Sequence, residues 1–195
     1  MILSDKSIKN KLKTKEIVIE PFNEDFLQPS SYDLHLGNEF MVFNTEKHSI
    51  IDVKEPVDDL MKKIILEQNG DITLEPGGFL LAHVKEIIGV DDKHVGVLEG
   101  KSSLARLGLI IHATAGFLDP GNCLRMTLEM VNLSPLPIKL YVGMKIAQMA
   151  FEEVDQKVSR PYGHKSLGSK YYKDSSVTQS MYYQNFNKDI TKPKI

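Results

Sequence analysis

The sequence predicts a mainly β fold, built as an antiparallel sandwich or barrel. From residue 72 onwards, short apolar runs are separated by Gly, Pro, Asn and Asp, and this spacing is typical of antiparallel strands rather than of βαβ repeats. A length of 195 residues suits one domain with a substantial core. The expected strands cover residues 78–84, 95–98, 107–111, 124–131, 138–142 and 145–151.

The N-terminal segment adds a short helix and a first strand. Ser4 is a candidate N-cap for a helix over residues 6–13, in which Ile8 and Leu12 lie on one face. Residues 17–19 are consecutive apolar and β-branched side chains, which predict a strand.

The segment from residue 32 to residue 66 mixes clear and ambiguous patterns. Tyr32, Leu34 and Leu36 alternate with Asp33 and His35, which is the period of a half-buried strand. A separate short strand is expected after it, and a charged stretch can then form either a helix or a surface excursion. These two segments cover residues 40–43 and 56–66.

The composition changes after about residue 158, which divides the chain into a β domain of residues 1–158 and a tail of residues 159–195. The tail is rich in Tyr, Ser, Gly and Lys and has no apolar periodicity, so it is either a frayed end or a flap that orders over a ligand. Its many aromatic side chains favour the flap, because solvated tails contain few of them. They are Tyr162, Tyr171, Tyr172, Tyr182, Tyr183 and Phe186.

Charge and composition exclude several classes of protein. The net charge of -2 and the lack of a long basic stretch argue against a nucleic-acid binder. No stretch approaches the roughly 20 apolar residues that a membrane span requires, and the first residues do not resemble a targeting segment. Cys123 is the only cysteine, so no intrachain disulfide can form, as expected in a reducing compartment. A cytoplasmic location is therefore expected.

The segment Glu-Gly-Lys-Ser-Ser-Leu-Ala-Arg-Leu-Gly at 99–108 combines two cations with two adjacent hydroxyls. Phosphate oxygens favour this combination of backbone N–H groups, hydroxyl donors and positive charge. The order of a Walker A loop is absent. A polar turn with serine caps and a surface Lys and Arg explains the same residues equally well, so both interpretations stay open.

The segment at 112–121 places small residues around Phe117 and ends in Asp119-Pro120-Gly121. Small residues allow the backbone to approach a planar ligand closely while the aromatic ring packs beside it. Asp119 taken alone is equally well explained as a residue that opens a turn.

The run at 124–130 has apolar side chains at its even positions, so Arg125, Thr127 and Glu129 share the opposite face of a strand. Glu129 can be a solvent-facing charge paired with a neighbouring cation. It can also be a carboxylate in a cleft, with a raised pKa that lets it transfer protons. The strand pattern does not separate these two interpretations.

A zinc-dependent deaminase site is excluded, because it requires a Cys-x-x-Cys pair in addition to a His or Cys followed closely by Glu. The six histidines show no close pairing that would replace the cysteines. A deaminase built on this chain must activate water without zinc.

At these segments the sequence resembles the dCTP deaminase family of the trimeric dUTPase-like superfamily. The resemblance rests on Lys-Ser-Ser-Leu-Ala-Arg at 101–106, Thr-Ala-Gly-Phe-Leu-Asp-Pro-Gly at 114–121 and Thr-Leu-Glu at 127–129. It extends over nearly the whole chain, and the number of matches in the same order argues against chance. The further matches are residues 1–5, 28–34, 143–148, 160–163 and 168–171.

The resemblance implies a distorted β-barrel or jelly-roll subunit in a homotrimer, with sites at the subunit interfaces. It implies dCTP as the substrate, with Mg²⁺ bound through the triphosphate, and it assigns no side chain to the metal. Glu129 would be the general base and acid, which takes a proton from the water attacking C4 and delivers it to the departing amine. Ser102 and Arg106 would orient that water and the carboxylate. Asp119 matches the carboxylate that activates water against the α-phosphorus in dUTPases.

The same resemblance implies that the 101–106 loop and the tail hold the triphosphate, with the tail closing as a lid. It also makes dTTP a plausible feedback inhibitor. The implied nucleotide-binding residues are Lys101, Ser102, Ser103, Leu104, Ala105, Arg106, Asp119, Thr127, Leu128, Glu129, Gln148, Tyr162, Lys170 and Asp174.

Gly116 and Phe117 match family members that continue from dUTP to dUMP and pyrophosphate, which supplies dUMP for thymidylate synthesis. Members that stop at dUTP tend to have a bulkier polar pair there. Asn122, Leu124 and Asp174 depart from the family pattern, and Asp174 stands where a Gln often contacts phosphate. Three alternatives stay open: a deaminase that releases dUTP, a dUTPase without deaminase activity, and a nucleotide-binding regulatory trimer.

Overall fold

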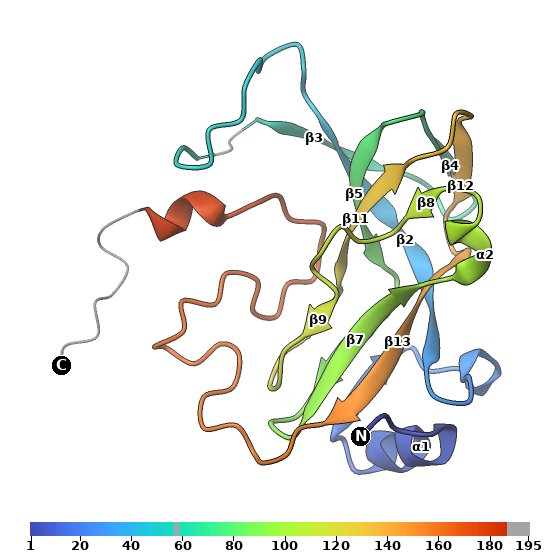
Figure 1. Ribbon diagram of the computed structural model, residues 1–195, viewed down its shortest axis with the longest axis vertical. Coiled ribbons are helices and arrows are strands. Elements are labelled where there is room, and N and C mark those ends of the chain that lie inside the picture. Colours follow the sequence, from blue (N-terminus) through green and yellow to red (C-terminus); the bar gives the residue numbers. More distant parts are fainter. Residues whose placement is uncertain (57–58, 187–195) are drawn as a thin grey trace.

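Antiparallel strands form the body of the protein in a computed structural model, which describes residues 1–56 and 59–186 (Figure 1). The predicted mainly β class is confirmed. The helices are α1 (Asp5–Lys13), α2 (Ser102–Ala105), η1 (Glu24–Phe26) and η2 (Tyr182–Asn185). The strands are β1 (Ile17–Glu20), β2 (Tyr32–Phe43), β3 (Met61–Ile65), β4 (Asp71–Leu74), β5 (Phe79–Val84), β6 (Ile87–Val90), β7 (His94–Gly100), β8 (Leu109–Ile110), β9 (Phe117–Leu118), β10 (Cys123–Leu124), β11 (Thr127–Asn132), β12 (Ile138–Tyr141) and β13 (Lys145–Glu153).

The largest sheet has the strand order β8-β11-β5-β2-β13-β7-β9, and β3 pairs with β2 beside it. Two smaller sheets, β1-β6-β10 and β12-β4, close the curled body. Strand β2 joins the two halves of the large sheet, since its first residues pair with β13 and its last residues pair with β5. A register shift between Leu36 and Phe40 interrupts the pairing of β2 with β5.

Strand β2 differs from its sequence prediction in two ways. Residues 32–36 and 40–43 belong to one continuous strand rather than to two strands. The polar face of its first half is also buried, with Asp33 only 2% and His35 only 8% exposed. Both polar groups have partners: Asp33 accepts from Lys101, and the His35 Nδ1 lies 2.7 Å from the Glu86 carboxylate. A curled sheet covers both faces of its central strand, which a period of two does not reveal.

Two other predicted elements need correction. The charged stretch at 56–66 contains strand β3 over its last residues and no helix over its described part. The apolar run at 124–131 is interrupted at Arg125 and Met126, because β10 pairs with β6 whereas β11 pairs with β5 and β8. The chain therefore crosses between two sheets inside one apolar run.

The N-terminal helix begins one residue earlier than predicted, at Asp5, and Ser4 caps it by accepting a hydrogen bond from the Ser7 N–H. Ile8 on its inner face is fully buried. Burying an aliphatic side chain of this size contributes roughly 1.5–3 kcal/mol, which is enough to hold so short a helix against the body.

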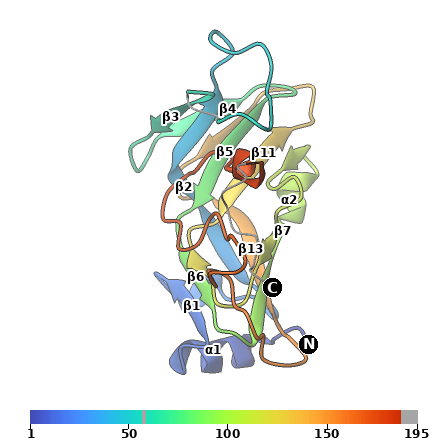
Figure 2. The same cartoon turned by 90° about the vertical axis from the view of Figure 1, so that its left-hand side faces the viewer.

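The tail leaves the body at the end of β13 and returns across it without forming a strand between residues 154 and 186. Figure 2 shows this orange and red segment crossing in front of the strands. Val177 in the tail is only 5% exposed, so part of the tail is packed rather than solvated. Among the described helices, none has the length and apolar character needed to cross a membrane.

Candidate active site

A cavity of about 470 Å³ lies between strand β11, the segment around β9 and the tail. Most of its wall is apolar, with tyrosines contributed by the tail. Its acidic side chains are Asp119, Glu129 and Asp174. Among residues 1–56 and 59–186, no Lys, Arg or His side chain lines it.

Glu129 faces this cavity because of the alternation of strand β11. Leu128 and Met130 are fully buried in the core, so Thr127 and Glu129 point to the opposite side. Both polar side chains are half-buried and line the cavity. Of the predicted shared face of Arg125, Thr127 and Glu129, the last two are present and face the cavity, whereas Arg125 lies before β11 and does not line the cavity.

The Glu129 carboxyl is in an environment that disfavours its charge. Burial raises its pKa, and the backbone N–H of Ala113 and the charge of His112 act in the opposite direction. The Ala113 N–H donates to Oε2 over 3.3 Å. A carboxyl with a raised pKa holds a proton more readily than an ordinary acid, which suits a group that must act both as general base and as general acid.

Asp119 follows directly after β9 and lies in the same cavity. Burial alone raises its pKa. The turn that follows Asp119 is fixed by backbone hydrogen bonds, since the Asn122 N–H donates to its carbonyl and the Gly121 N–H donates to the Asp91 carbonyl. Gly121 has φ +85°, and a Cβ there would lie 2.5 Å from Pro161, so a glycine is required for the tail to pack on this turn.

The tail completes the wall on the open side of the cavity. The Tyr162 N–H donates to the Pro120 carbonyl at 2.8 Å, and the Tyr162 hydroxyl accepts from the Tyr171 N–H. The backbone of Asp174 accepts from the Arg125 N–H at 2.9 Å. The Asp174 side chain accepts from the Ser176 N–H within its own turn.

A partly exposed ion pair anchors the tail on strands β2 and β3. The Ser176 hydroxyl donates to Glu39 at 2.6 Å, and Lys63 lies 2.6 Å from the same carboxylate. Lys63 also donates to the Ser176 hydroxyl at 2.8 Å. The Lys63 ammonium and the Ser176 hydroxyl lower the pKa of Glu39 to about 2. We call Glu39, Lys63 and Ser176 the tail anchor.

The predicted phosphate loop lies away from this cavity. Figure 1 shows α2 on one side of strands β7 and β11 and the tail on the other. Ser102, Ser103, Ala105 and Arg106 are exposed, and within the described residues no hydrogen bond or ion pair joins Ser102 or Arg106 to Glu129.

Lys101, at the start of α2, is held by the buried carboxylate of Asp33. Its ammonium lies 2.6 Å from Asp33, and Lys145 pairs with the same carboxylate at 3.0 Å. These two cations lower the pKa of Asp33 against the effect of its burial. Gln148 lies nearby on β13, where its amide donates to the Gly100 carbonyl and accepts from the Ser31 hydroxyl.

The structure therefore divides the residues implied by the resemblance into two groups. The cavity group is Asp119, Thr127, Glu129, Phe117, Tyr162 and Asp174. The loop group, which does not line the cavity, comprises residues 101–106 and Gln148. Lys170 lines a separate surface depression with Ser169 and Gln184.

Two residues of the predicted binding set turn their side chains to the core. Leu128 is fully buried, and the half-buried Leu104 packs against the core cluster. Any contact of Leu128 with a nucleotide must therefore come from its backbone.

A comparison with known protein families identifies the family of the chain. A family model described as dCTP deaminase-like matches residues 2–154. The chain belongs to the dCTP deaminase-like family.

Relatives of this deaminase-like chain match over almost the full length. It is 42% identical over 186 residues to the dUMP-forming dCTP deaminase of Corynebacterium jeikeium (strain K411), covering 95% of this chain and 99% of the relative. It is 41% identical over 189 residues to the dUMP-forming dCTP deaminase of Mycolicibacterium vanbaalenii, covering 97% and 100%. The crystal structure of the 2'-deoxycytidine 5'-triphosphate deaminase from Agrobacterium tumefaciens matches with a TM-score of 0.61 and 20% identity, covering 78% of this chain and 48% of that one. This last likeness supports the fold.

In this deaminase-like chain, Gly116 occupies a position that no larger residue fits. A Cβ there would lie 2.9 Å from the Leu98 carbonyl oxygen and 3.1 Å from the His112 ring. The Gly116 carbonyl also accepts from the Leu98 N–H at 2.7 Å. Gly116 thus lets the 112–116 segment pack closely against β7.

The positions that depart from the family pattern have structural partners here. Asn122 is only 5% exposed, and its amide oxygen accepts from the N–H groups of Cys123 and Lys173. It therefore connects the turn after Asp119 to the tail. Leu124 is half-buried and lines the cavity.

Sequence reasoning missed the apolar wall of the cavity and the support of Lys101. Phe43 and Phe79 lie 5.4 Å apart between ring centroids and line the cavity from strands β2 and β5. In the sequence, nothing distinguishes these two phenylalanines from ordinary core residues. Asp33 occupies a polar position in an alternating strand, and this pattern predicts an exposed side chain. Only the tertiary structure reveals that Asp33 is buried beside Lys101.

The tail anchor predicts the behaviour of a Glu39→Gln variant. A hydrogen bond to a charged group contributes about 1.5–3 kcal/mol, so we expect the tail to open about tenfold more often. Limited trypsin cleavage at tail lysines should accelerate by a similar factor. The matched control is Glu46→Gln, since Glu46 is an exposed partner of Lys62 on β3. Equal cleavage rates in the two variants would contradict the anchor.

The pH dependence of the anchor follows from the lowered pKa. The stabilisation by Glu39 is fully present above the ordinary carboxyl value of 4.5, and it is lost as the pH falls towards about 2. Tail cleavage by an acid-tolerant protease should therefore increase in the wild type below pH 4.5, and much less in Glu39→Gln.

Proposed function

We propose that the protein hydrolyses dCTP to dUTP and ammonia, and then hydrolyses dUTP to dUMP and pyrophosphate. The proposal is supported by full-length relatives named as dUMP-forming dCTP deaminases at 41–42% identity. Each step consumes one water molecule. The first replaces the C4 amino group by oxygen, and the second cleaves the bond between the α-phosphorus and the bridging oxygen.

The observation that best supports deamination is the environment of Glu129. The carboxyl lies in a mainly apolar cavity, burial raises its pKa, and one backbone N–H orients it. In the proposed reaction, Glu129 takes a proton from the water that attacks C4 and transfers it to the departing amine. The net proton balance of Glu129 over the cycle is zero.

The triphosphate needs cations that the cavity of one described chain does not provide. The cavity contributes carboxylates, whereas the loop at 101–106 has cations and hydroxyls on another face. We therefore propose that a second copy of the chain brings its Ser102 and Arg106 to the cavity, in a homotrimer with sites at the subunit interfaces.

Exposed apolar side chains around α2 and β8 support such an assembly. Leu107 is 59%, Leu133 is 67% and Leu136 is 70% exposed. The Leu133 N–H donates to the Gly108 carbonyl, so the turn that contains Leu133 and Leu136 lies beside the segment that contains Leu107. Exposed apolar side chains in one region favour burial against another protein surface.

Mg²⁺ is proposed to enter with the triphosphate. The half-buried carboxylates of Asp119 and Asp174 provide oxygen donors, which suit Mg²⁺. When bound, the ion neutralises phosphate charge. Asp119 is proposed to activate water against the α-phosphorus, and residues 159–195 to act as a lid that holds Tyr162 and Lys170 near the phosphates. We also propose a cytoplasmic location, and dTTP as an inhibitor that competes for the same cavity.

The decisive experiment is to incubate the purified protein with dCTP and Mg²⁺ and to identify every product. We expect ammonia, dUMP and pyrophosphate in equal amounts. Accumulation of dUTP would identify a deaminase that stops after the first step. Tight binding of dCTP without any product would overturn the proposal in favour of a regulatory protein.

Substitution of Glu129 should separate chemistry from binding. We expect Glu129→Gln to reduce ammonia release by at least about 100-fold, the usual contribution of a general base, while dCTP binding measured by calorimetry changes little. In the wild type, the raised pKa places the acidic limb of the kcat/KM profile above 4.5, because only the ionised carboxylate accepts a proton. Normal activity in the variant would exclude Glu129 as the base.

If each site is formed by two copies of the chain, two variants that are inactive alone should recover activity when they are mixed. Glu129→Gln lacks the cavity carboxylate, and Arg106→Ala lacks the loop cation of the partner copy. Mixed trimers contain some sites with an intact Glu129 from one copy and an intact Arg106 from another, so activity should reappear after subunit exchange. Exchange is verified by co-purification of differently tagged chains. Exchange without recovered activity would show that each site uses a single chain.

A further inference from the structure

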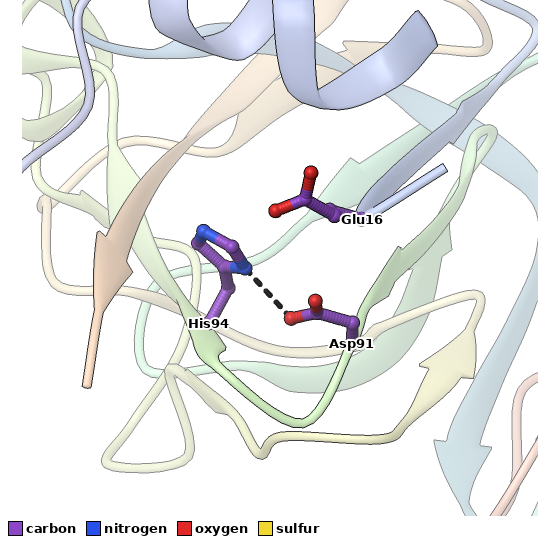
Figure 3. A group of neighbouring side chains, drawn as sticks. All are labelled: Glu16, Asp91 and His94. Atoms are coloured by element: carbon purple, nitrogen blue, oxygen red, sulfur yellow. Dashed lines mark hydrogen bonds and ion pairs between the residues drawn. The ribbon is translucent and has the colours of Figure 1, made fainter. Parts of the chain in front are cut away.

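His94, Asp91 and Glu16 form a compact cluster at the end of the molecule near α1, remote from the cavity residues Glu129 and Thr127 on β11. Figure 3 shows their side chains converging from three places: the segment before β1, the turn between β6 and β7, and the start of β7. One potential ligand atom from each residue lies within 4.8 Å of the others.

The imidazole of His94 is placed between carboxylates on both of its edges. Its Nδ1 lies 2.7 Å from the Asp91 carboxylate, and Figure 3 shows Glu16 on this same side of the ring. Its Nε2 is buried without a hydrogen-bond partner, and the Glu153 carboxylate lies 3.8 Å from it. The His94 side chain is only 1% exposed.

The cluster has more negative than positive charge. Glu16, Asp91 and Glu153 contribute three carboxylates, and among the side chains that the structure describes Lys11 is the ammonium that pairs with them, bonded to Glu16 and 3.7 Å from Glu153. With a neutral imidazole the sum is therefore two negative charges. A divalent cation would balance it.

We propose that Glu16, Asp91 and the Nδ1 of His94 bind a divalent transition-metal ion. Two carboxylates and an imidazole suit ions such as Mn²⁺, Fe²⁺ and Zn²⁺, whereas Mg²⁺ prefers oxygen ligands alone. A neutral imidazole carries one proton, so the Nδ1 of His94 binds the ion through its lone pair and the proton resides on Nε2. The Nε2–H then donates to Glu153, as ligating histidines commonly do to a neighbouring carboxylate.

Access and geometry are compatible with such a site. The side chains of Glu16 and Asp91 are 30% and 26% exposed, so an aqueous ion can reach them and keep water in its open positions. Metal–ligand distances of about 2.0–2.2 Å require the three ligand atoms to draw closer, which small rotations of the two partly exposed carboxylates allow.

The site differs in place and role from the proposed reaction. It joins the start of β1 to the β6–β7 turn, where the Asp91 N–H already donates to the Glu16 carbonyl at 2.9 Å. The Asp91 carbonyl in turn accepts from the Gly121 N–H, two residues after Asp119. An ion bound here would therefore stabilise the turn that supports Asp119 without contacting the substrate.

The test is a titration of the full chain with Mn²⁺, without nucleotide, in which the loss of the free-ion electron paramagnetic resonance signal measures binding. We expect one ion per chain, displaced by Zn²⁺ but not by equimolar Mg²⁺. Asp91→Asn and Glu16→Gln should weaken this binding more than about tenfold, and Glu153→Gln about tenfold.

Asp92→Asn is the matched control, because Asp92 lies in the same turn but pairs with Lys157 at 2.7 Å. Its affinity for Mn²⁺ should equal that of the wild type. Asp91→Asn keeps an oxygen that can accept from the Lys93 N–H, which Asp91 now does at 2.9 Å, so its fold is expected to survive and is checked by thermal unfolding. Equal Mn²⁺ affinity in the wild type and Asp91→Asn, or no binding by either, would overturn the proposal and leave a cluster of ion pairs around an imidazolium.

Discussion

The alternation of strand β11 is the constraint on which the cavity depends. Leu128 and Met130 are fully buried, and this burial fixes the orientation of the strand between β5 and β8. Thr127 and Glu129 must then face the cavity, since neighbouring strand residues point to opposite sides. A shift of one residue would place Glu129 in the apolar core, so the hydrophobic face sets the position of the polar one.

Three acids of this chain show how charge placement sets protonation. Glu39 has a Lys63 ammonium beside it, and its pKa falls to about 2. Asp33 is more deeply buried, but two lysines still lower its pKa. Glu129 has no lysine or arginine partner among the described residues, so burial prevails and its pKa rises. The placement of lysine ammonium groups within the chain thus separates acids that stay ionised from one whose charge is disfavoured.

The sequence predicted those elements whose patterns are local. The alternation at 127–130 correctly identified the faces of β11, and Ser4 correctly marked the start of α1. It did not reveal that Asp33 is buried, because the strands that cover it come from distant parts of the chain. For the same reason, the separation of the 101–106 loop from Glu129 depends on the fold of the sheet. The resemblance to the family identifies residue types at matching positions but gives no distances between them, so it could not show this separation either.

The tail affects the chemistry of the cavity as well as its shape. Burial is the cause that raises the pKa of both Asp119 and Glu129, and Tyr162 and Tyr171 of the tail form part of the wall that excludes water. If the tail left the cavity, water would solvate both carboxylates, and their pKa values would return towards those of ordinary acids. The tail anchor at Glu39, which holds the tail in place from outside the cavity, therefore helps to keep both carboxyls buried.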